Sequence, residues 1–142
     1  MRRSSRAMLP LFPSLAAAFL GACASGGGSG AGAPSRPATS DQAYAGPAVA
    51  IDSATGPNHL IVLTAPTPGW SFSFDQVGPT DGDIYVTVRP PDPSLLYAAM
   101  IVEQKLDSTV PSGKPARVYV RMLEFGEKAG SQAYRLAKET AR

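Results

Sequence analysis

The stretch Trp70-Ser71-Phe72-Ser73-Phe74-Asp75, followed by Ile84-Tyr85-Val86-Thr87-Val88, decides the fold of this 142-residue chain. In both runs large apolar side chains recur at every second position, which is the period of a strand with one buried face. Between the runs, Gly78-Pro79-Thr80-Asp81-Gly82-Asp83 is rich in turn-forming residues. The two runs are therefore predicted to pair as an antiparallel β-hairpin.

The same two-residue period recurs on both sides of this hairpin. Downstream, residues 118–122 alternate behind a turn at 111–115, and residues 100–107 alternate ahead of that turn, which suggests that they form a partner strand. Upstream, residues 59–65 are apolar on both faces, as in a central strand, and residues 48–52 are the predicted first strand. About six strands with no long helix predict an all-β fold, either a small antiparallel Ig-like sandwich or a partly open barrel.

Two segments carry no clear strand pattern. Residues 93–99 begin with a serine at position 94 that can cap a helix, so a short turn is expected there. The tail 126–142 contains helix formers but no defined apolar face, and it is predicted to be a short helix or disordered. The β domain is accordingly expected to span residues 42–125.

The first 22 residues have the composition of a secretory signal. Three arginines precede an uncharged apolar run at 7–20, which is too short and too rich in proline to span a bilayer as a helix. Residues 23–41 consist almost entirely of Gly, Ser, Ala, Pro and Thr. Such a composition cannot bury enough apolar surface to order itself, so this segment is predicted to be a flexible linker.

The junction Leu20-Gly21-Ala22-Cys23 resembles the lipobox of bacterial lipoproteins. In that class a signal peptidase cuts between the residues numbered here Ala22 and Cys23, and the cysteine then carries diacylglycerol. The resemblance implies a membrane partner, the lipid bilayer, held through acylated Cys23, and two or more acyl chains give stable anchoring. Because Ala24 and not an aspartate follows the cysteine, the class implies the outer membrane, facing the periplasm. The alternative is an ordinary secretory signal with an incidental cysteine.

Charge and cysteine content narrow the function classes. Three of the 13 basic residues precede Cys23, which leaves ten against 11 acidic residues in the remaining chain. No clustered basic surface is evident, so no nucleic-acid partner is expected, and no motif suggests a cofactor. Cys23 is the only cysteine, so no intramolecular disulfide can stabilise the domain.

No catalytic or metal-binding motif is recognised, and the protein is not expected to be an enzyme. Nucleophilic catalysis needs a nucleophile and an oriented base, whereas the only histidine, His59, begins an apolar strand. Asp81, Asp83 and Asp92 lie in turns, where aspartate serves backbone geometry, and they offer too few oxygens for calcium. An enzyme of unrecognised type would need these carboxylates or Asp75 to converge with His59 in a pocket.

Candidate binding residues surround the proline-rich loop that follows the hairpin. We expect contact with a partner through the loop Arg89 to Leu96 or through a sheet edge, and Arg89, Asp92, Tyr97 and Trp70 are the candidate residues. Trp70 is the sole tryptophan. It is predicted to occupy the centre of the core, with stacking on a carbohydrate or other ligand as the alternative.

The runs Pro68 to Phe74 and Gly82 to Val88, followed by Pro90-Pro91-Asp92-Pro93, resemble small β domains of bacterial protease-accessory lipoproteins. The resemblance implies a binding or complex-stabilising role. The leading functional prediction is therefore an envelope lipoprotein that presents a non-catalytic β domain to an envelope protein partner. The alternative is a structural envelope lipoprotein that contacts peptidoglycan or anionic lipid through its basic tail, which contains Lys128, Arg135, Lys138 and Arg142.

Overall fold

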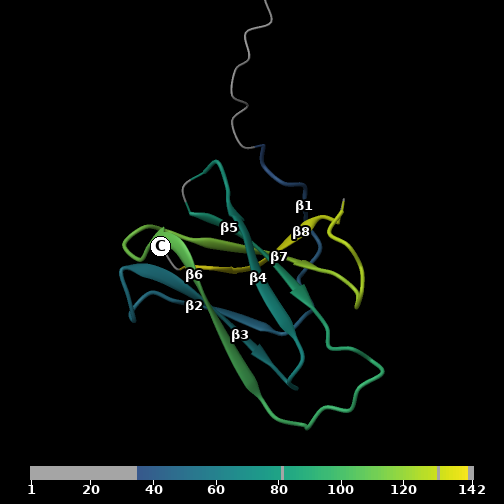
Figure 1. Ribbon diagram of the computed structural model, residues 1–142. Coiled ribbons are helices and arrows are strands. Elements are labelled where there is room, and N and C mark those ends of the chain that lie inside the picture. The colour runs from purple at the N-terminus through teal and green to yellow at the C-terminus, as the bar shows by residue number, and fades with distance from the viewer. Residues whose placement is uncertain (1–34, 81, 131, 141–142) are drawn as a thin grey trace, which may run out of the picture. The chain divides into compact units, whose positions relative to one another are not determined.

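The computed structural model describes residues 35–80, 82–130 and 132–140, which form eight strands and no helix (Figure 1). The strands are β1 (Thr39–Ser40), β2 (Ala48–Asp52), β3 (Asn58–Ala65), β4 (Ser71–Val77), β5 (Asp83–Arg89), β6 (Val102–Pro111), β7 (Arg117–Met122) and β8 (Tyr134–Glu139). In this part of the chain no helix has the length and apolarity required to cross a membrane.

The strands form two open sheets. The larger sheet has the order β1-β8-β7-β5-β4, and the smaller has the order β2-β3-β6. The predicted all-β class is confirmed, and the arrangement is a small sandwich. The prediction of purely antiparallel pairing is wrong in two places, because β5 pairs with β7, and β1 with β8, in parallel.

The predicted hairpin is confirmed as β4 and β5. The two strands pair antiparallel from Ser71 opposite Arg89 to Val77 opposite Ile84, and the register shifts between Phe74 and Gln76. The shift is a bulge at Asp75, whose side chain points away from the core. Strands β2 and β3 also form where the sequence pattern placed them, with β3 at the centre of its sheet.

The expected pairing of the strands on either side of turn 111–115 is wrong. β6 pairs with β3 in the smaller sheet, whereas β7 lies between β5 and β8 in the larger one. The turn therefore carries the chain from one sheet to the other. β7 is buried along most of its length. Such burial fits a central strand with a neighbour on each side, and does not fit a strand at the edge of a sheet.

The prediction of a helical or disordered tail is also wrong. Residues 134–139 form strand β8, which pairs antiparallel with β7, so the tail is part of the domain. Strand β1, from the segment predicted to be linker, pairs with the start of β8. The domain thus begins before residue 42 and continues beyond residue 125.

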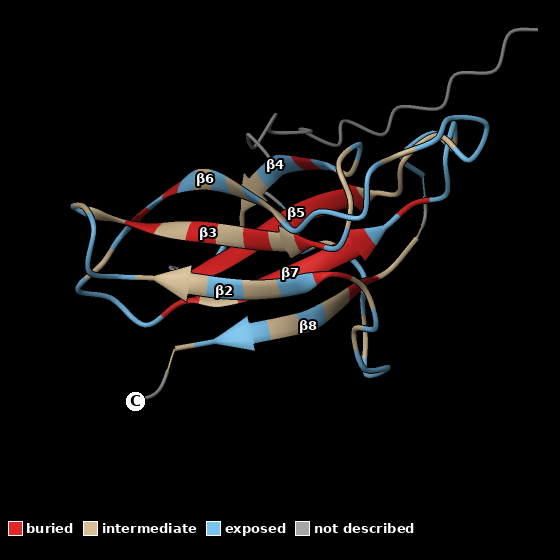
Figure 2. Ribbon diagram, turned by 90° about the horizontal axis from the view of Figure 1, so that it is seen from below, coloured by how far each residue is buried: buried red, intermediate tan, exposed pale blue. Residues whose placement is uncertain are grey.

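The core lies between the two sheets, and Figure 2 shows its buried residues concentrated on β3, β5 and β7. Its buried members are Ile61, Leu63, Phe72, Ile84, Val86, Val88, Val110, Ala116, Val118 and Val120. The prediction that Trp70 occupies the centre is wrong, since Trp70 is only partly buried and packs at the margin of this cluster. Trp70 immediately precedes β4, at the end of the sandwich where that strand begins.

Candidate functional site

Four loops meet at one end of the sandwich, which we call the loop end. β5 and β7 run parallel and finish together, with Val88 opposite Met122, and β4 starts there with Ser71 opposite Arg89. In the smaller sheet, β3 ends beside the start of β6. The loops gathered here are 41–47, 66–70, 90–101 and 123–133. Figure 1 shows the loop 90–101 projecting from this end.

The loop 90–101 is held in shape by contacts near its start. The Asp92 carboxylate accepts hydrogen bonds from the backbone N–H and the hydroxyl of Ser94, at 2.8 and 2.7 Å. The hydrogen bond from the Ser94 hydroxyl lowers the pKa of Asp92, because it stabilises the ionised carboxylate. The Leu95 N–H closes the turn on the Asp92 carbonyl at 3.2 Å. Three prolines fix further backbone angles, so the loop has a preformed turn.

The loop is also fastened to its neighbours. The Arg89 guanidinium donates to the carbonyl of Glu127, which joins its base to loop 123–133. At Gly69, where φ is +93°, a Cβ atom would lie 2.4 Å from the Tyr97 ring and 2.8 Å from Pro91. Only glycine therefore allows Tyr97 to approach the loop 66–70 so closely.

Three of the predicted binding residues thus have internal contacts in the loop end. Arg89, Asp92 and Tyr97 support the loop, and their part in binding a partner stays a prediction. Sequence reasoning named the loop as far as Leu96, but it did not single out the apolar side chains that the loop exposes, which are Leu95, Leu96, Met100 and Ile101. Leu96 is fully exposed, and the other three are more than half exposed. The available signal was an adjacent leucine pair within a proline-rich loop.

A cleft of about 550 Å³ opens at the same end, next to the loop. Its lining consists of Ser40, Gln42, Tyr44, Ala45, Trp70, Pro90, Val120, Met122, Leu123, Glu124, Gln132, Ala133 and Arg135. Trp70 belongs to this lining, so the expected alternative role in contacting a ligand stays a prediction. Burial raises the pKa of Tyr44 to about 12. The lining combines aromatic, aliphatic and polar side chains, as small-ligand sites do.

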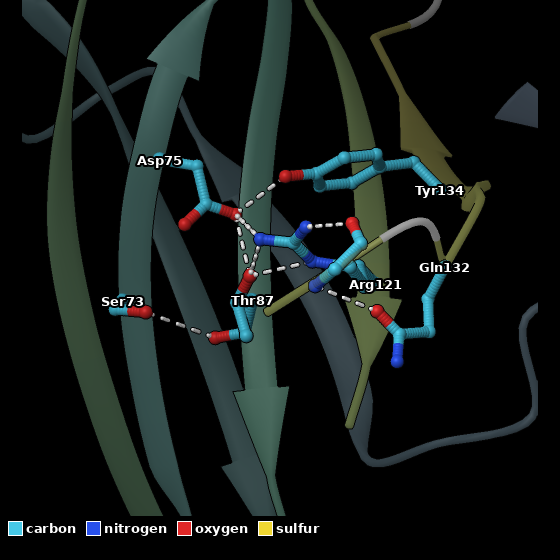
Figure 3. A network of polar contacts seen from close by, with 7 residues as sticks. Ser73, Asp75, Thr87, Arg121, Gln132 and Tyr134 are labelled. Atoms are coloured by element: carbon cyan, nitrogen blue, oxygen red, sulfur yellow. Dashed lines mark hydrogen bonds and ion pairs between the residues drawn. The ribbon is translucent and has the colours of Figure 1, made fainter. Parts of the chain in front are cut away.

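A buried polar network covers part of the outer face of the larger sheet (Figure 3). The Nε and Nη2 atoms of Arg121 donate to Thr87 Oγ1 at 3.1 and 2.9 Å, and Thr87 Oγ1 donates to Asp75 Oδ2 at 2.5 Å. The Tyr134 hydroxyl donates to the same carboxylate oxygen at 2.9 Å, and its ring lies 4.7 Å from the Arg121 guanidinium carbon. Burial and the nearby Asp75 raise the pKa of Tyr134 to about 12. Because the charged groups are paired with one another, the network stabilises the sheet.

A second cluster on this face binds the segment that was predicted to be linker. Tyr85 stacks on Tyr119 with ring centroids 5.1 Å apart. Arg36 Nη2 donates to the Tyr119 hydroxyl at 3.3 Å and lies 3.9 Å from the buried Asp83 carboxylate, which Arg117 approaches to 2.6 Å. The Tyr85 hydroxyl beside it raises the pKa of Arg36. Arg36 therefore attaches its segment to the domain.

His59 has a structural position at the start of β3. It is buried, and its Nε2 lies 2.7 Å from the carbonyl oxygen of Lys114 while its Nδ1 lies 2.9 Å from the Ser53 hydroxyl. Because a carbonyl oxygen can only accept, Nε2 donates to Lys114. The side chain thereby ties together the turns 53–57 and 111–116.

The carboxylates considered for catalysis are dispersed in the structure. Asp75 and Asp83 lie on the outer face, Asp92 lies in the projecting loop, and Asp81 is outside the described residues. Among the described residues, no hydrogen bond joins any of them to His59. In the same part of the chain, no three His, Cys, Asp or Glu side chains come together where they could hold a metal ion.

The remaining predicted sites fall partly beyond what the structure describes. Ala22 and Cys23 lie outside the described residues, as does Arg142. The other basic residues of the tail are separated, since Lys128 lies in loop 123–133, Arg135 lines the cleft and Lys138 is exposed on β8. Comparisons with protein-family models, with curated proteins and with solved structures find no match, so the loop end itself is the basis for inferring function.

Proposed function

We propose that the protein is a lipid-anchored lipoprotein of a bacterial cell envelope, on the periplasmic side of the outer membrane. In this proposal its β domain binds another envelope protein through the loop end. Cleavage after Ala22 would make Cys23 the acylated first residue. The segment 24–34 would hold the domain away from the bilayer. The domain acts by binding or by stabilising a complex, without catalysis.

The observation that carries this proposal is the set of apolar side chains exposed on loop 90–101. Exposed apolar patches in soluble domains mark interaction sites. Fully burying a leucine, isoleucine or methionine against a partner contributes roughly 1.5–3 kcal/mol. The contacts of Asp92 and Tyr97 preform the loop, which lowers the entropic cost of ordering it on binding.

Site-specific photo-crosslinking in cells tests the loop as a contact surface. A photoreactive amino acid at Leu96 is expected to give a discrete adduct with one envelope protein. The matched control places it at Leu136, an exposed apolar position on β8. The Leu96 adduct should disappear when Leu95 and Ile101 are both replaced by serine. Equal adducts from both positions, or none from Leu96, would contradict the proposal.

The lipid anchor is tested separately. Replacing Cys23 by serine should abolish incorporation of a labelled fatty acid and release the protein from the membrane fraction. The anchor assignment fails if the serine variant still carries the label. Because the domain and its loop are unchanged in this variant, the result does not bear on the protein-binding surface.

The structural alternative, contact with peptidoglycan or anionic lipid through the basic tail, receives less support. A polyanionic surface is best bound by cations gathered on one face. Lys128, Arg135 and Lys138 occupy a loop, the cleft lining and an exposed strand position. Deleting the tail cannot test this alternative cleanly, because the tail supplies β8.

A further inference from the structure

The cleft at the loop end contains a cation that has no partner among the residues that the structure describes. Arg135 lies opposite Val120, a core residue, so its side chain leaves β8 on the core-facing side of the sheet. It is half-buried and lines the cleft. Within residues 35–80, 82–130 and 132–140, no hydrogen bond, ion pair or aromatic ring engages its guanidinium.

The other arginines of the described residues differ in this respect. Each contacts an acidic, carbonyl or hydroxyl group; they are Arg36, Arg89, Arg117 and Arg121. A guanidinium that has no internal partner and faces a cleft is available to pair with an anionic ligand. The planar guanidinium fits a carboxylate with two parallel hydrogen bonds.

The charge of the lining limits the kind of anion. Of the described residues that line the cleft, Arg135 and Glu124 alone are charged, and no ion pair links them. One cation opposed by one carboxylate suits a singly charged ligand better than a phosphate dianion, which is usually held by several cations. A volume of about 550 Å³ is that of a small-molecule site, large enough for a short peptide end.

The rest of the lining suits a peptide. Met122 points to the core side of β7, like Val120, yet is almost half exposed, so it offers apolar surface within the cleft together with Trp70. The Gln42 side chain has no partner among the described residues, and its amide can bond to peptide groups. A fatty acid, which has only its carboxylate to bond, would leave such a group unused.

We propose that the cleft binds the free C-terminal carboxylate of a peptide, with the Arg135 guanidinium as its ion-pair partner. The apolar side chain next to that carboxylate packs against Trp70 and Met122, and Gln42 bonds to the preceding peptide group. The inference goes beyond the proposed function, since it depends neither on the lipid anchor nor on contact through loop 90–101.

Trp70 provides the readout, because it is the sole tryptophan and lines the cleft. The full chain in detergent is titrated with acetyl-alanyl-leucine, either as the free acid or as the C-terminal amide, and tryptophan emission is recorded. The acid is expected to change the emission saturably and to bind about tenfold or more tightly than the amide, the ratio expected for a hydrogen-bonded charge. Added salt should weaken binding of the acid.

Two variants test whether Arg135 causes the preference for the acid over the amide. Arg135→Gln should abolish the preference for the acid. Lys138→Gln removes the same charge from the same strand at an exposed position outside the cleft, and should keep the preference. Circular dichroism checks that both variants retain their β-sheet spectrum. If Arg135→Gln fails to fold, the comparison of acid with amide on the unmodified protein still shows whether the protein binds a free carboxylate.

Several outcomes would overturn the proposal. Equal affinity for acid and amide, or no response of Trp70 to either peptide, excludes carboxylate binding here. If the Arg135→Gln variant folds and still prefers the acid, Arg135 is not the group that binds the carboxylate. Stronger competition by inorganic phosphate than by the acid would assign the cleft to a dianion and not to a peptide.

Discussion

Replacing Thr87 by valine should reveal how much the outer-face network stabilises the domain. The Thr87 hydroxyl accepts two hydrogen bonds from Arg121 and donates one to Asp75. Valine has nearly the same shape, so the change removes these three bonds without opening a cavity. Valine also favours strands at least as well as threonine. Any destabilisation therefore reports the lost hydroxyl.

The expected cost follows from the contacts. Hydrogen bonds to charged groups contribute about 1.5–3 kcal/mol each. The direct contact of Arg121 with Asp75, at 3.4 Å, remains and offsets part of the loss. We expect Thr87→Val to lower the free energy of unfolding by about 2–4 kcal/mol, which is a large part of the total stability of a small domain.

Urea unfolding followed by the fluorescence of Trp70 measures this cost. Thr87→Ser is the matched control, because it keeps the hydroxyl and loses one methyl group, at about 1 kcal/mol. Combining Thr87→Val with Tyr134→Phe, which removes another bond to Asp75, should give a non-additive sum. The reasoning is refuted if the valine variant is as stable as the serine variant or more so.

Three further perturbations test other parts of the structure. Gly69→Ala should cost about 1–3 kcal/mol, because of its positive φ and the clash with Tyr97, and should speed proteolysis within the projecting loop; an unchanged cleavage rate would contradict this. Deleting residues 126–142 removes β8 and should abolish cooperative thermal unfolding by circular dichroism, whereas a dispensable tail would leave the melting curve intact. Folding raises the pKa of Tyr44 and Tyr134 to about 12 from about 10. Their contribution to the free energy of unfolding is therefore complete below pH about 10 and is lost as the pH rises toward about 12. Urea midpoints that stay constant between these two pH values would contradict this prediction.

The hairpin of β4 and β5 could be predicted because its signals are local. Its alternating side chains and its turn lie within one continuous stretch, so no distant contact is needed to define it. The same holds for β2 and β3, which are short apolar runs between turn residues. The all-β class followed from these elements together.

Strand β8 could not be predicted in the same way. Its sequence, Tyr134-Arg135-Leu136-Ala137-Lys138-Glu139, contains good helix formers and no run of β-branched residues. It becomes a strand because β7 offers an edge to pair with. Tertiary pairing of this kind overrides local propensity. The exchange of β6 and β7 between sheets is likewise decided by long-range burial and not by the turn between them.

Only those parts of the candidate site that have a local sequence signal could be predicted. Sequence reasoning found Trp70 and the proline-rich loop, since a sole tryptophan and clustered prolines are visible locally. It assigned Arg135 to a basic tail, because only the register of β8 with β7 places that side chain in the cleft that Trp70 also lines. Exposure of the leucine pair in loop 90–101 also depends on which neighbouring residues the fold brings near.

The short strand β1 has a mechanical consequence. It is joined to β8 by two residue pairs, and Arg36 adds contacts just before it. A load pulling on the N-terminal segment would strain these contacts before it reached the core. Their release would free residues 35–43 as an extra spacer of at most about 30 Å, while Tyr44 stayed packed against the core and β2 to β8 stayed folded. Under tension the domain could thus extend its reach without unfolding.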